Sequence, residues 1–504
     1  MLTNVFSCAV LGLAGAAITI EVDVSRGYPM FIVVGLPDAA VSESRQRIPT
    51  AIRNSGFLYP YAKRVVVNLA PADLKKEGAS YDLPIAVGIL FSTEQIRGDL
   101  SRSVFVGELA LDGSVRPSRG VLPIALWARD AGFEHLYIPA ANAPEASVVS
   151  GIRIMPVAAL SELVSHLNGQ ELISPLPKLE RRATAELEYS IDFSDIAGQE
   201  HAKRALEIAA AGSHNVAMSG PPGSGKTMLS HAAVTILPDM TFEEQLEVTK
   251  IASIAGTLPQ DVPLITARPF RSPHHTASGI ALVGGGAFPR PGEISLAHRG
   301  VLFLDEFAEF SRSVLENLRQ PLEDGRITVS RAQGSVTFPA RFILVASFNP
   351  CPCGFLGDSE RACTCTQSQI VKYRAKISGP IADRIDLHVE VPRVPFEKLE
   401  SRGSETSAQI RERVNRARSA QNARLAQYHI FTNSEMEARL VRQLCVLDAP
   451  GRALIRQAVG SLHLSARGFH RVLKVSRTIA DLAGEQSITA SHIAEALQYR
   501  PKDD

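Results

Sequence analysis

The 504-residue sequence lacks the features of a membrane or exported protein. It has no apolar run of the roughly 20 residues that a membrane-crossing helix needs. The amino terminus, MLTNVFSCAVLGLAGAAITIEVDV, is apolar but has no basic segment ahead of the apolar stretch, so it does not fit a secretory signal. We therefore expect a cytoplasmic protein with no membrane partner.

The sequence also lacks an excess of charge, an internal repeat and a low-complexity tract. The formal net charge is only +1, so the global balance gives no signal for nucleic acid. Such a partner is not excluded, because a local basic surface can be offset by acidic residues elsewhere. The 45% hydrophobic and 21% charged residues are typical of a globular protein, and at about 100–200 residues per domain the length predicts roughly three domains.

The first region alternates short β-rich segments with helical ones, which predicts an α/β domain over residues 1–170. Residues 171–190 are polar, with two prolines and a charge run but no sustained period, and are predicted to be a linker. A peripheral helix packed on either neighbour is the alternative. The expected strands are ITIEVDV, MFIVVG, RVVVNLA, VFVGELAL and HLYIPA, and the expected helices are DAAVSESRQRIPTAIRNSG and DLPIAVGILFS.

Two further regions follow the linker. Residues 191–395 contain strands that lead directly into phosphate-type loops, which is typical of a doubly wound parallel sheet. Residues 396–504 are nearly all helical in pattern, and most of these helices open near a Ser or Thr that can cap them. We expect an α/β core followed by an all-α domain.

The clearest motif lies between an apolar strand, NVAMS, and a helical segment, MLSHAAVTIL. Its glycines allow backbone N–H groups to wrap phosphates, Lys226 neutralises the β and γ oxygens, and the Thr227 hydroxyl faces Mg²⁺. A chance match is the alternative, but the strand and helix that the motif requires are both present. The sequence predicts an ATP site made of Gly220, Pro221, Pro222, Gly223, Ser224, Gly225, Lys226, Thr227 and Met228.

A second motif, VLFLDE, is a buried strand that ends in two carboxylates. Asp305 is predicted to hold Mg²⁺ through its water shell. Glu306 is predicted to polarise the attacking water, because phosphoryl transfer chiefly needs a positioned nucleophile and charge stabilisation. Acidic residues that cap the next helix are the alternative.

Four of the six cysteines lie close together in the sequence. Their pairs, C-P-C and C-T-C, are separated by nine residues, and four thiolates suit a closed tetrahedral Zn²⁺ site. Buried or free thiols are the alternative. A metal in the segment 351–365 would have a structural role, with Cys351, Cys353, Cys363 and Cys365 as ligands.

These motifs resemble a known family. Residues 190–504 are similar to the magnesium-chelatase-like AAA+ ATPases, and nearly the whole chain resembles the bacterial YifB/ComM group. The resemblance implies that Asn349 senses the γ-phosphate, that Arg384 is an arginine finger inserted into a neighbouring subunit, and that Arg467 is the sensor-2 arginine of a helical lid. It is carried by DIAGQEHAKRALEIAAAGSHN, GPPGSGKT, RPFRSPHHTAS, GGGAFPRPGEISLAHRGVLFLDE, NPCPCG, SGPIADRIDLHVEVP and LSARGFHRVLKVSRTIADL.

A cation supplied by a neighbour makes hydrolysis depend on assembly, so the resemblance implies self-association into a ring, with six subunits as the expected number. Taken alone, Arg384 beside Asp383 and Asp386 fits a surface ion pair, which is the alternative for this residue.

Two segments are candidates for contact with DNA. The segment 268–300, with three consecutive glycines and Pro-flanked arginines, suits a loop and matches the helix-2 insert of related ring motors. GRITVSRAQGSVTFPARF has a hairpin pattern and resembles the pre-sensor-1 hairpin. Arg290 and Arg331 are the predicted DNA contacts, and ordinary solvated loops are the alternative. Two adjacent histidines of the insert, His274 and His275, are expected to point to opposite faces and to have a structural role.

The amino-terminal domain resembles the Lon-type protease domain, with KEGAS at the nucleophile position and GELALDGSVRPSRGVLPIA after it. Leu122 occupies the position aligned with the dyad lysine and cannot accept a proton from Ser80. We therefore expect a non-proteolytic scaffold, similar to that of the branch-migration protein RadA.

The resemblance thus implies a Lon-protease-like α/β domain, an AAA+ P-loop core and an all-α lid. It implies a ring-forming, ATP-dependent DNA translocase or helicase that drives branch migration in homologous recombination and natural transformation. Single-stranded or branched DNA, bound without sequence preference, is the expected partner. The motor subunit of a magnesium-chelatase-type complex, which remodels a protein partner, is the alternative. An AAA+ protease is disfavoured by Leu122.

Overall fold

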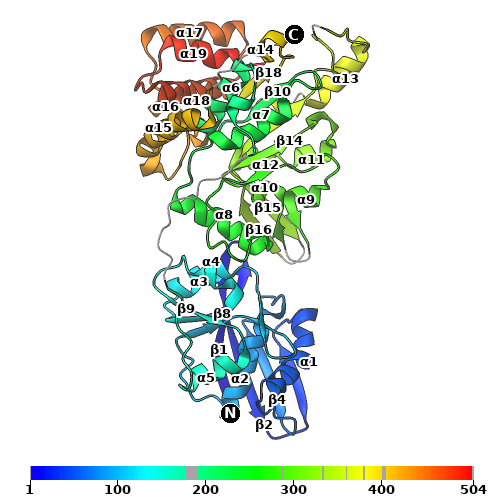
Figure 1. Cartoon of the computed structure of the whole chain (residues 1–504), viewed down its shortest axis with the longest axis vertical. Helices are drawn as coiled ribbons and strands as arrows, with labels where there is room; N and C mark the ends of the chain where they lie inside the picture. The colour runs from blue at the N-terminus through cyan, green and yellow to red at the C-terminus, as the bar shows by residue number, and fades with distance from the viewer. Residues whose placement is uncertain are drawn as a thin grey trace.

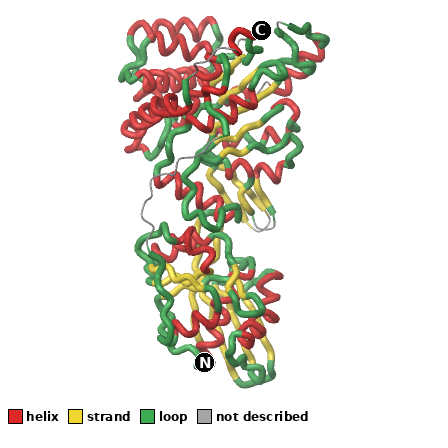
Figure 2. The backbone as a smooth tube through the Cα atoms, in the orientation of Figure 1, coloured by secondary structure: helices red, strands yellow, loops and turns green. Residues whose placement is uncertain are grey.

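Three regions follow one another along the long axis of the molecule in this computed structural model (Figure 1). It describes residues 2–177, 190–286, 289–331, 334–358, 360–377, 381–399 and 405–501. An α/β region lies at one end, a parallel sheet with its helices lies in the middle, and a bundle of helices lies at the other end (Figures 1 and 2). Within these residues, none of the helices combines the length and the hydropathy that crossing a bilayer needs.

The amino-terminal region is built on a seven-stranded sheet of order β3-β4-β2-β1-β5-β8-β9. Alternation along β2 and β4 buries every second residue, so that Ile20, Val22, Val65 and Val67 form one core with α1 and α2. The elements are β1 (Leu2–Leu11), β2 (Ala14–Ser25), β3 (Met30–Val34), α1 (Ala39–Asn54), β4 (Arg64–Ala70), α2 (Asp82–Ser92), β5 (Ser103–Phe105), β6 (Glu108–Leu109), β7 (Val115–Arg116), α3 (Val121–Asp130), β8 (His135–Pro139), α4 (Ala143–Ala146), β9 (Arg153–Val157) and α5 (Leu160–Leu167).

The described part of the expected linker, residues 171–177, contains no helix. Ile173 is buried in the core of the amino-terminal region, and the Leu176 N–H donates to the Ile154 carbonyl at 2.9 Å. These residues therefore lie against the first domain. Residues 178–189 of the expected linker lie outside the described residues.

The middle region is organised by a parallel five-stranded sheet of order β11-β14-β17-β10-β18. Strand β10 is buried on both faces: Val216 and Met218 face one core, and Ala217 faces the other. The elements are α6 (Glu200–Gly212), β10 (Val216–Ser219), α7 (Lys226–Ala233), α8 (Phe242–Ala255), β11 (Phe270–Arg271), β14 (Val301–Leu304), α11 (Arg312–Glu316), α12 (Arg319–Asp324), β17 (Ile343–Phe348), α13 (Gln367–Ile377), β18 (Leu387–Glu390) and α14 (Phe396–Leu399).

Two excursions leave this sheet. The first, between β11 and β14, contains α9 (Gly279–Val283), β12 (Gly284–Gly285), β13 (Arg290–Pro291) and α10 (Glu293–Leu296), so it has more regular structure than the expected loop. The second is the expected hairpin, β15 (Arg326–Arg331) paired antiparallel with β16 (Gly334–Pro339). Both reach toward the amino-terminal region (Figure 1).

The carboxyl-terminal region consists of helices that share a core with one face of the middle sheet. Apolar residues of α15 recur at Ile410, Val414, Ala417 and Leu425, a helical spacing that places them on one buried face. The side chains of Thr406 and Ser465 cap α15 and α18, as the sequence predicted. The helices are α15 (Ser407–Leu425), α16 (Ala438–Leu444), α17 (Ala449–Ser461), α18 (Ala466–Ala483) and α19 (Ala490–Gln498).

The predicted fold class is confirmed: the protein is α/β, with a mixed sheet in the amino-terminal region, a parallel sheet in the middle and a helical carboxyl-terminal region. The domain boundaries stay predictions. The first two regions are in contact, because the Gly120 N–H donates to the Ser253 carbonyl at 3.2 Å and Ser253 Oγ donates to Glu145 at 2.6 Å. Leu13, in the turn between β1 and β2, packs against the core that contains Val336 of β16.

Candidate active site

The P-loop lies between β10 and the amino end of α7, with its backbone bent by two glycines. Gly223 and Gly225 have φ values of +77° and +92°, which side chains other than glycine rarely adopt. A Cβ on Gly220 would lie 2.1 Å from the Val391 carbonyl oxygen, so only glycine fits beside the chain that leaves β18. The loop is therefore held in a shape that leaves backbone N–H groups and the start of a helix available to phosphates.

The Lys226 ammonium lies inside this loop. It donates to the carbonyl oxygens of Gly220 at 2.7 Å and Pro221 at 2.9 Å, and to Asn349 Oδ1 at 3.4 Å. Burial lowers the pKa of Lys226, and the nearby Asp305 carboxylate opposes that shift. Lys226 and Asn349, which are 123 residues apart, are thus brought to one point at the carboxyl ends of neighbouring strands.

Asp305 follows β14 and is held by two hydroxyl groups. Thr227 Oγ1 donates to Asp305 Oδ2 at 3.1 Å, and Ser347 Oγ donates to Asp305 Oδ1. Thr227 and Asp305 are the residues predicted to face Mg²⁺, and a hydroxyl beside a carboxylate is a suitable oxygen pair for that ion. These residues fit the metal, and Ser347 fixes the orientation of the carboxylate.

Glu306 has a backbone φ of +51°, in the left-handed region that glycine favours. Its carboxylate is not part of the Asp305 cluster: Oε2 lies 3.2 Å from His275 Nδ1. The His275 ring in turn lies 4.1 Å from the His274 ring. The expectation that the two histidines point to opposite faces is therefore wrong, because the chain at this position is a bend between β11 and α9 and not a strand.

The cysteine segment begins two residues after Asn349 and packs on the P-loop. Gly354 has a φ of +86°, and a Cβ there would lie 2.7 Å from Pro222 Cδ. The segment is also tied to the chain after β18, where Arg393 Nε donates to Asp358 at 2.8 Å. The conformation of the cysteine segment therefore affects the position of the P-loop.

The four sulfur atoms of Cys351, Cys353, Cys363 and Cys365 all lie within 4.8 Å of one another. The Sγ–Sγ distances are 3.3 Å between Cys351 and Cys353, and 3.6 Å from each of these to Cys363. A tetrahedral zinc site with Zn–S bonds of about 2.3 Å has sulfur atoms about 3.8 Å apart. All four cysteines are free thiols, so the cluster fits zinc.

Arg384 and Arg467 do not lie at the P-loop of their own chain. Arg384 is buried, and its guanidinium pairs with Glu323 of α12. Arg467 is 70% exposed, and its NH2 lies 3.5 Å from Glu323 Oε1. The two arginines, 83 residues apart (467 − 384), thus share one carboxylate. The alternative of a surface pair between Arg384 and Asp383 or Asp386 does not describe this arrangement.

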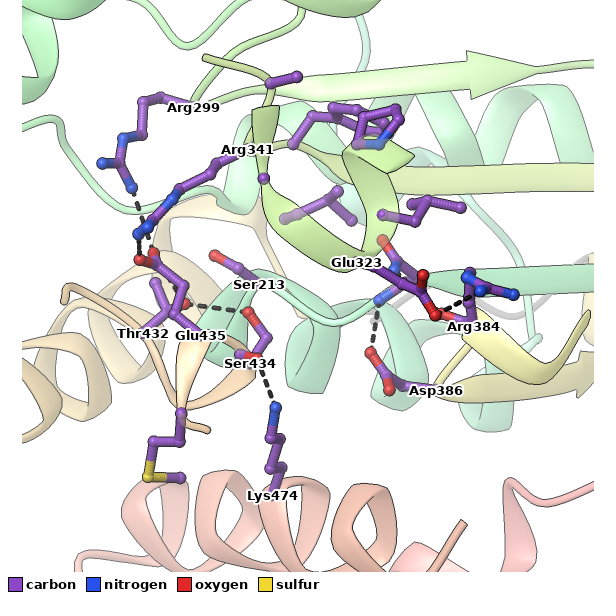
Figure 3. A pocket seen from close by; sticks show the side chains of 18 of the residues that line it. Ser213, Arg299, Glu323, Arg341, Arg384, Asp386, Thr432, Ser434, Glu435 and Lys474 are labelled. Carbon is purple, nitrogen blue, oxygen red and sulfur yellow. Dashed lines mark hydrogen bonds and ion pairs between the residues drawn. The ribbon is translucent and has the colours of Figure 1, made fainter. Parts of the chain in front are cut away.

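Both arginines line a cavity of about 620 Å³ at the amino ends of the strands (Figure 3). Its walls include the residues that precede four strands, Asn215, Gly300, Phe342 and Asp386, and none of the residues 220–227. The cavity therefore opens at the edge of the sheet opposite to the P-loop.

Basic side chains dominate this cavity, and they are only partly neutralised. Glu435 lies between Arg299 and Arg341 (Figure 3). Burial lowers the pKa of Lys474, whose ammonium donates to the Ser434 carbonyl at 2.8 Å. The lining cations are Arg268, Arg299, Arg326, Arg341, Arg384, Arg418, Arg467, Arg471 and Lys474, against the carboxylates of Glu244, Glu323, Asp324, Asp386, Glu435 and Glu437.

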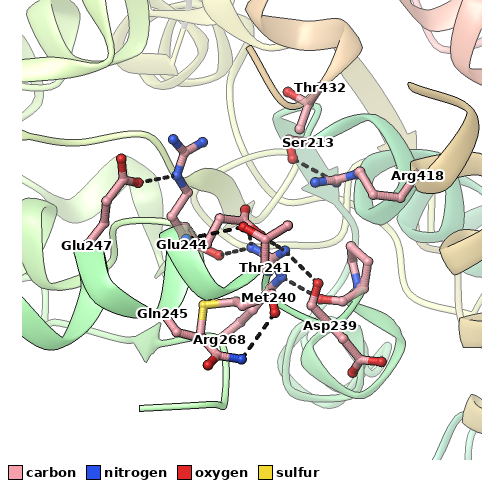
Figure 4. A network of polar contacts seen from close by, with 12 residues as sticks. Ser213, Asp239, Met240, Thr241, Glu244, Gln245, Glu247, Arg268, Arg418 and Thr432 are labelled. Carbon is pink, nitrogen blue, oxygen red and sulfur yellow. Dashed lines mark hydrogen bonds and ion pairs between the residues drawn. The ribbon is translucent and has the colours of Figure 1, made fainter. Parts of the chain in front are cut away.

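A network of polar contacts lies where the middle region meets the helical region (Figure 4). Arg268 bonds both carboxylate oxygens of Glu244, at 3.1 and 2.9 Å. Arg418 of α15 is fully enclosed and donates to the Ala210 and Ala211 carbonyls, and burial lowers its pKa to about 9. These contacts attach the helical region to the amino edge of the sheet.

Comparison with known proteins assigns the family. A family model described as magnesium chelatase, subunit ChlI, matches residues 192–399, and one for the carboxyl-terminal part of that subunit matches residues 404–500. The competence protein ComM of Haemophilus influenzae is 46% identical, over 99% of this chain and 97% of ComM. The protein YifB of Escherichia coli is 42% identical, over 100% of this chain and 97% of YifB. The chain belongs to the ComM/YifB family.

Two further findings concern the chelatases themselves. A third model, described as subunit ChlI of Mg-chelatase, matches residues 20–142 of the amino-terminal region. The 38 kDa subunit of magnesium chelatase from Rhodobacter capsulatus is 25% identical, over 62% of this chain and 88% of that subunit. Membership of this magnesium-chelatase-like AAA+ family supports ATP and Mg²⁺ as ligands of the P-loop and supports ATPase activity.

The predicted DNA contacts of this ComM/YifB family member lie on the two excursions from the sheet. Arg290, on β13, is half exposed, and its NH2 lies 3.2 Å from Glu77 Oε1 of the amino-terminal region. The backbone of Arg331 ends β15, but its side chain and residues 332–333 lie outside the described residues. Contact of either arginine with DNA stays a prediction.

Ser80 of the amino-terminal region lies in a short turn, Ala79–Tyr81, ahead of α2. In the described part of the chain, no hydrogen bond joins the Ser80 hydroxyl to a lysine, histidine or carboxylate. Leu122 is buried in α3, and its N–H donates to Glu145 at 3.3 Å. The buried Lys76 ammonium donates to the Pro71 carbonyl. A non-proteolytic role for this region stays our prediction.

Several residues of the site were not found from the sequence. The sequence does give a signal for Ser347. Residues two apart in a strand point to the same face of the sheet, and Ser347 lies two residues before Asn349. The sequence gives no signal for Glu323, since nothing near it in the sequence indicates that it pairs with Arg384, 61 residues away, or with Arg467. His275 was noticed and given a structural role, whereas the structure places it at Glu306.

Proposed function

We propose that this protein is a ring-forming, ATP-dependent DNA translocase of the helicase type that drives branch migration in homologous recombination, including the recombination that follows DNA uptake. ATP and Mg²⁺ bind at the P-loop, and zinc braces the cysteine segment. The ring, with six subunits expected, encloses single-stranded or branched DNA without reading its sequence.

One observation carries the proposal: the two halves of a hydrolysis site lie at opposite edges of one sheet. The P-loop, Asp305 and Asn349 are at the carboxyl edge, whereas Arg384 and Arg467 are at the amino edge, joined by Glu323. Arg384 and Arg467 therefore lie too far from the P-loop of their own chain to complete its site. A neighbour that presents its amino edge to the P-loop completes the site, and repetition of that contact closes a ring.

Each residue has a defined task in this arrangement. Lys226 and the P-loop N–H groups bind the β and γ phosphates, and Thr227 with Asp305 holds Mg²⁺, which neutralises phosphate charge. Glu306 takes the proton of the attacking water, and Asn349 orients that water and the γ-phosphate. Arg384 and Arg467 of the neighbour stabilise charge that develops in the transition state.

The DNA part of the proposal rests on the family. ComM, with 46% identity over nearly the full length of both chains, is by its name a competence protein. The two excursions from the sheet supply candidate contacts, because a basic hairpin or loop in a pore follows a phosphate backbone without reading bases. A motor that moves along DNA would be useful when strands that have been taken up are integrated.

The proposal is tested by ATPase and strand-displacement assays with forked and four-way DNA. Lys226→Ala and Glu306→Gln serve as inactive controls. We expect the wild-type ATPase rate to rise with DNA and labelled strands to be displaced only by the wild-type protein with ATP. Absence of stimulation and displacement with any of these substrates would contradict the DNA role.

A second candidate is the motor subunit of a magnesium-chelatase-type complex, which remodels a partner protein. It is favoured by the three chelatase family models, including the match to residues 20–142. The amino-terminal region is therefore similar to a chelatase subunit as well. Under this candidate the ATPase rate responds to a protein partner and not to DNA.

A further inference from the structure

The sheet of the amino-terminal region ends in two outer strands, β9 and β3, which differ in what lies beside them. Strand β9 is covered by the chain itself, because the Leu176 N–H donates to the Ile154 carbonyl at 2.9 Å. Strand β3 pairs with β4, and in the part of the chain that the structure describes no other segment hydrogen-bonds to the backbone of residues 30–34. The outer side of β3 therefore presents N–H and C=O groups with which a further strand can pair.

The side chains of β3 make this outer strand apolar on the face that is turned away from the core. Val33 is buried in the core, whereas Met30 and Val34 point to the opposite face and are 41% and 42% exposed. Leu36, just after the strand, is also exposed. An exposed apolar strand at the end of a sheet favours association with another chain.

Cations gather at the start of this strand. Arg26, Lys63 and Arg64 are exposed there, at the ends of β2 and β4 that lie beside the first residue of β3. Residues 24–37 and 44–72 contain no aspartate or glutamate. The acidic residues of β2 lie farther in, because β4 separates that strand from β3. A negatively charged partner is therefore favoured at this end of β3.

This end of β3 lies far from the motor. Strand β2 has 12 residues, so its two ends are about 35 Å apart. The turn before β2 packs on the middle region through Leu13, so the turn after β2, which leads into β3, lies at the far end of the molecule (Figure 1). A partner bound there leaves the P-loop and the cavity at the amino edge accessible.

We propose that β3 is a docking site for an extended acidic segment of another protein, which adds a strand to the sheet. Main-chain hydrogen bonds to residues 30–34 hold the segment, and its alternate apolar side chains pack on Met30 and Val34. Its carboxylates meet the three cations at the start of the strand. This surface goes beyond the proposed function, since it gives the protein a partner at the end opposite to the motor.

The same end of the molecule also exposes two aromatic rings, those of Tyr28 and Tyr61. Bases stack on such rings, so a polynucleotide is the other occupant that the test must separate. The free backbone of β3 and its aliphatic face favour the peptide, because neither offers a base a stacking partner.

The test measures binding of a fluorescent peptide, EEVTVTVEE, to the full-length protein by anisotropy. In one control peptide proline replaces the central valine and removes an N–H from the added strand. In a second control peptide lysines replace the glutamates. A single-stranded oligothymidylate with the same label is the polynucleotide probe.

Two changes are made at β3, and two matched changes are made at the covered side of the sheet. Met30→Ala combined with Val34→Ala removes the apolar contacts, and Lys63→Glu reverses one charge. In the controls, Leu172→Ala removes an exposed apolar side chain and Arg153→Glu reverses an exposed charge on β9. ATP turnover without DNA is measured for every variant and should stay at the wild-type value, which shows that the proteins are folded.

We expect saturable binding of EEVTVTVEE to the wild-type protein. Either change at β3, the proline in the peptide and the lysines in the peptide should each weaken that binding by about tenfold or more, because each removes contacts from a small interface. The two control variants should bind the peptide like the wild type.

Absence of saturable peptide binding to the wild-type protein would overturn the proposal, and so would binding that both changes at β3 leave unaltered. Oligothymidylate binding that Lys63→Glu weakens, without peptide binding, would assign the surface to polynucleotide instead. A dimer that forms at high concentration and is lost in the Met30→Ala and Val34→Ala variant would assign it to a second copy of this chain. Stimulation of the ATPase by DNA is measured separately, so failure of this proposal and failure of the proposed function are distinguishable.

Discussion

The two edges of the middle sheet differ in how their functional residues are held. At the carboxyl edge, the P-loop and Asp305 are fixed by local backbone shape and by hydroxyl groups, in a site that can bind a nucleotide without help. At the amino edge, arginines from α18 and from the segment before β18 converge on Glu323 beside a cavity rich in cations. In the proposed function, one edge binds the nucleotide and the other supplies a cation to the neighbouring chain.

The largest effect should come from the amino edge. Arg384→Ala removes the cation that we propose stabilises the transition state in the neighbour's site, so we expect turnover to fall by about 10³-fold or more, with nucleotide affinity unchanged. A fluorescent nucleotide titration measures affinity, and phosphate release measures turnover. Arg319→Ala, which breaks an exposed pair with Glu316, is the matched control and should leave both unchanged. Substantial turnover in Arg384→Ala would refute the assignment.

Metal removal should next act on the carboxyl edge, because the cysteine segment packs on the P-loop there. Loss of zinc frees the chain around Gly354 and Pro222, so nucleotide affinity is expected to fall by about tenfold. Metal analysis should find one zinc per chain in the wild type, none in Cys363→Ser, and one in Cys445→Ala, whose thiol lies in another core. If the purified wild-type protein contains no zinc and all four thiols can be titrated, the zinc site is refuted.

Acid should weaken the amino edge at Asp386. Burial by itself raises the pKa of Asp386, but His214, Arg471 and Lys474 bring it down to about 2. A carboxyl group with a lowered folded-state pKa contributes stability above its unfolded pKa of about 3.8, and that stability is lost as the pH falls toward 2. Asp386→Asn should therefore cost about 2 kcal/mol at pH 7 and progressively less below pH 4.

Urea unfolding followed by circular dichroism measures this difference at each pH. Asp383→Asn is the control, since Asp383 is exposed and three residues away, and it should change stability by less than about 0.5 kcal/mol at any pH. A difference between wild type and Asp386→Asn that stays constant down to pH 3 would contradict the assigned pKa direction.

A further effect is expected at the hydroxyl that orients Asp305. Ser347→Ala leaves Asp305 with Thr227 as its remaining side-chain donor, and partners of metal-binding groups typically matter by about tenfold or somewhat more. The variant should need more Mg²⁺ for half-maximal turnover, whereas Ser313→Ala on the surface of α11 should not. An unchanged Mg²⁺ dependence in Ser347→Ala would show that the other two donors to Asp305, the Thr227 hydroxyl and the Glu306 N–H, are enough to position the carboxylate.

The same two edges show what a sequence can reveal. The carboxyl edge is built from contiguous motifs, each a strand followed by its functional residues, so the sequence predicts that Lys226, Asp305 and Asn349 lie close together. Parallel strands bring such residues to one edge by topology alone. Their catalytic roles stay predictions, as do those of Arg384 and Arg467.

The amino edge is different, because it depends on how helices pack onto the sheet. Glu323 receives Arg384 and Arg467 only through that packing, and Glu435 meets Arg299 and Arg341 in the same way. Such pairs have no local pattern, since each joins residues 61 or more positions apart. The position of His275 was likewise misjudged, because adjacent side chains diverge in a strand but not at a bend.

The central claim is that each ATP is hydrolysed between two chains, and mixing two inactive variants tests it most directly. Lys226→Ala has a defective P-loop and an intact Arg384, whereas Arg384→Ala has the reverse. If the site is shared, rings assembled from both proteins contain interfaces with an intact P-loop facing an intact arginine, and turnover reappears at an intermediate ratio of the two. If turnover stays absent at every ratio while mixed rings form, hydrolysis is completed within one chain and the account is contradicted.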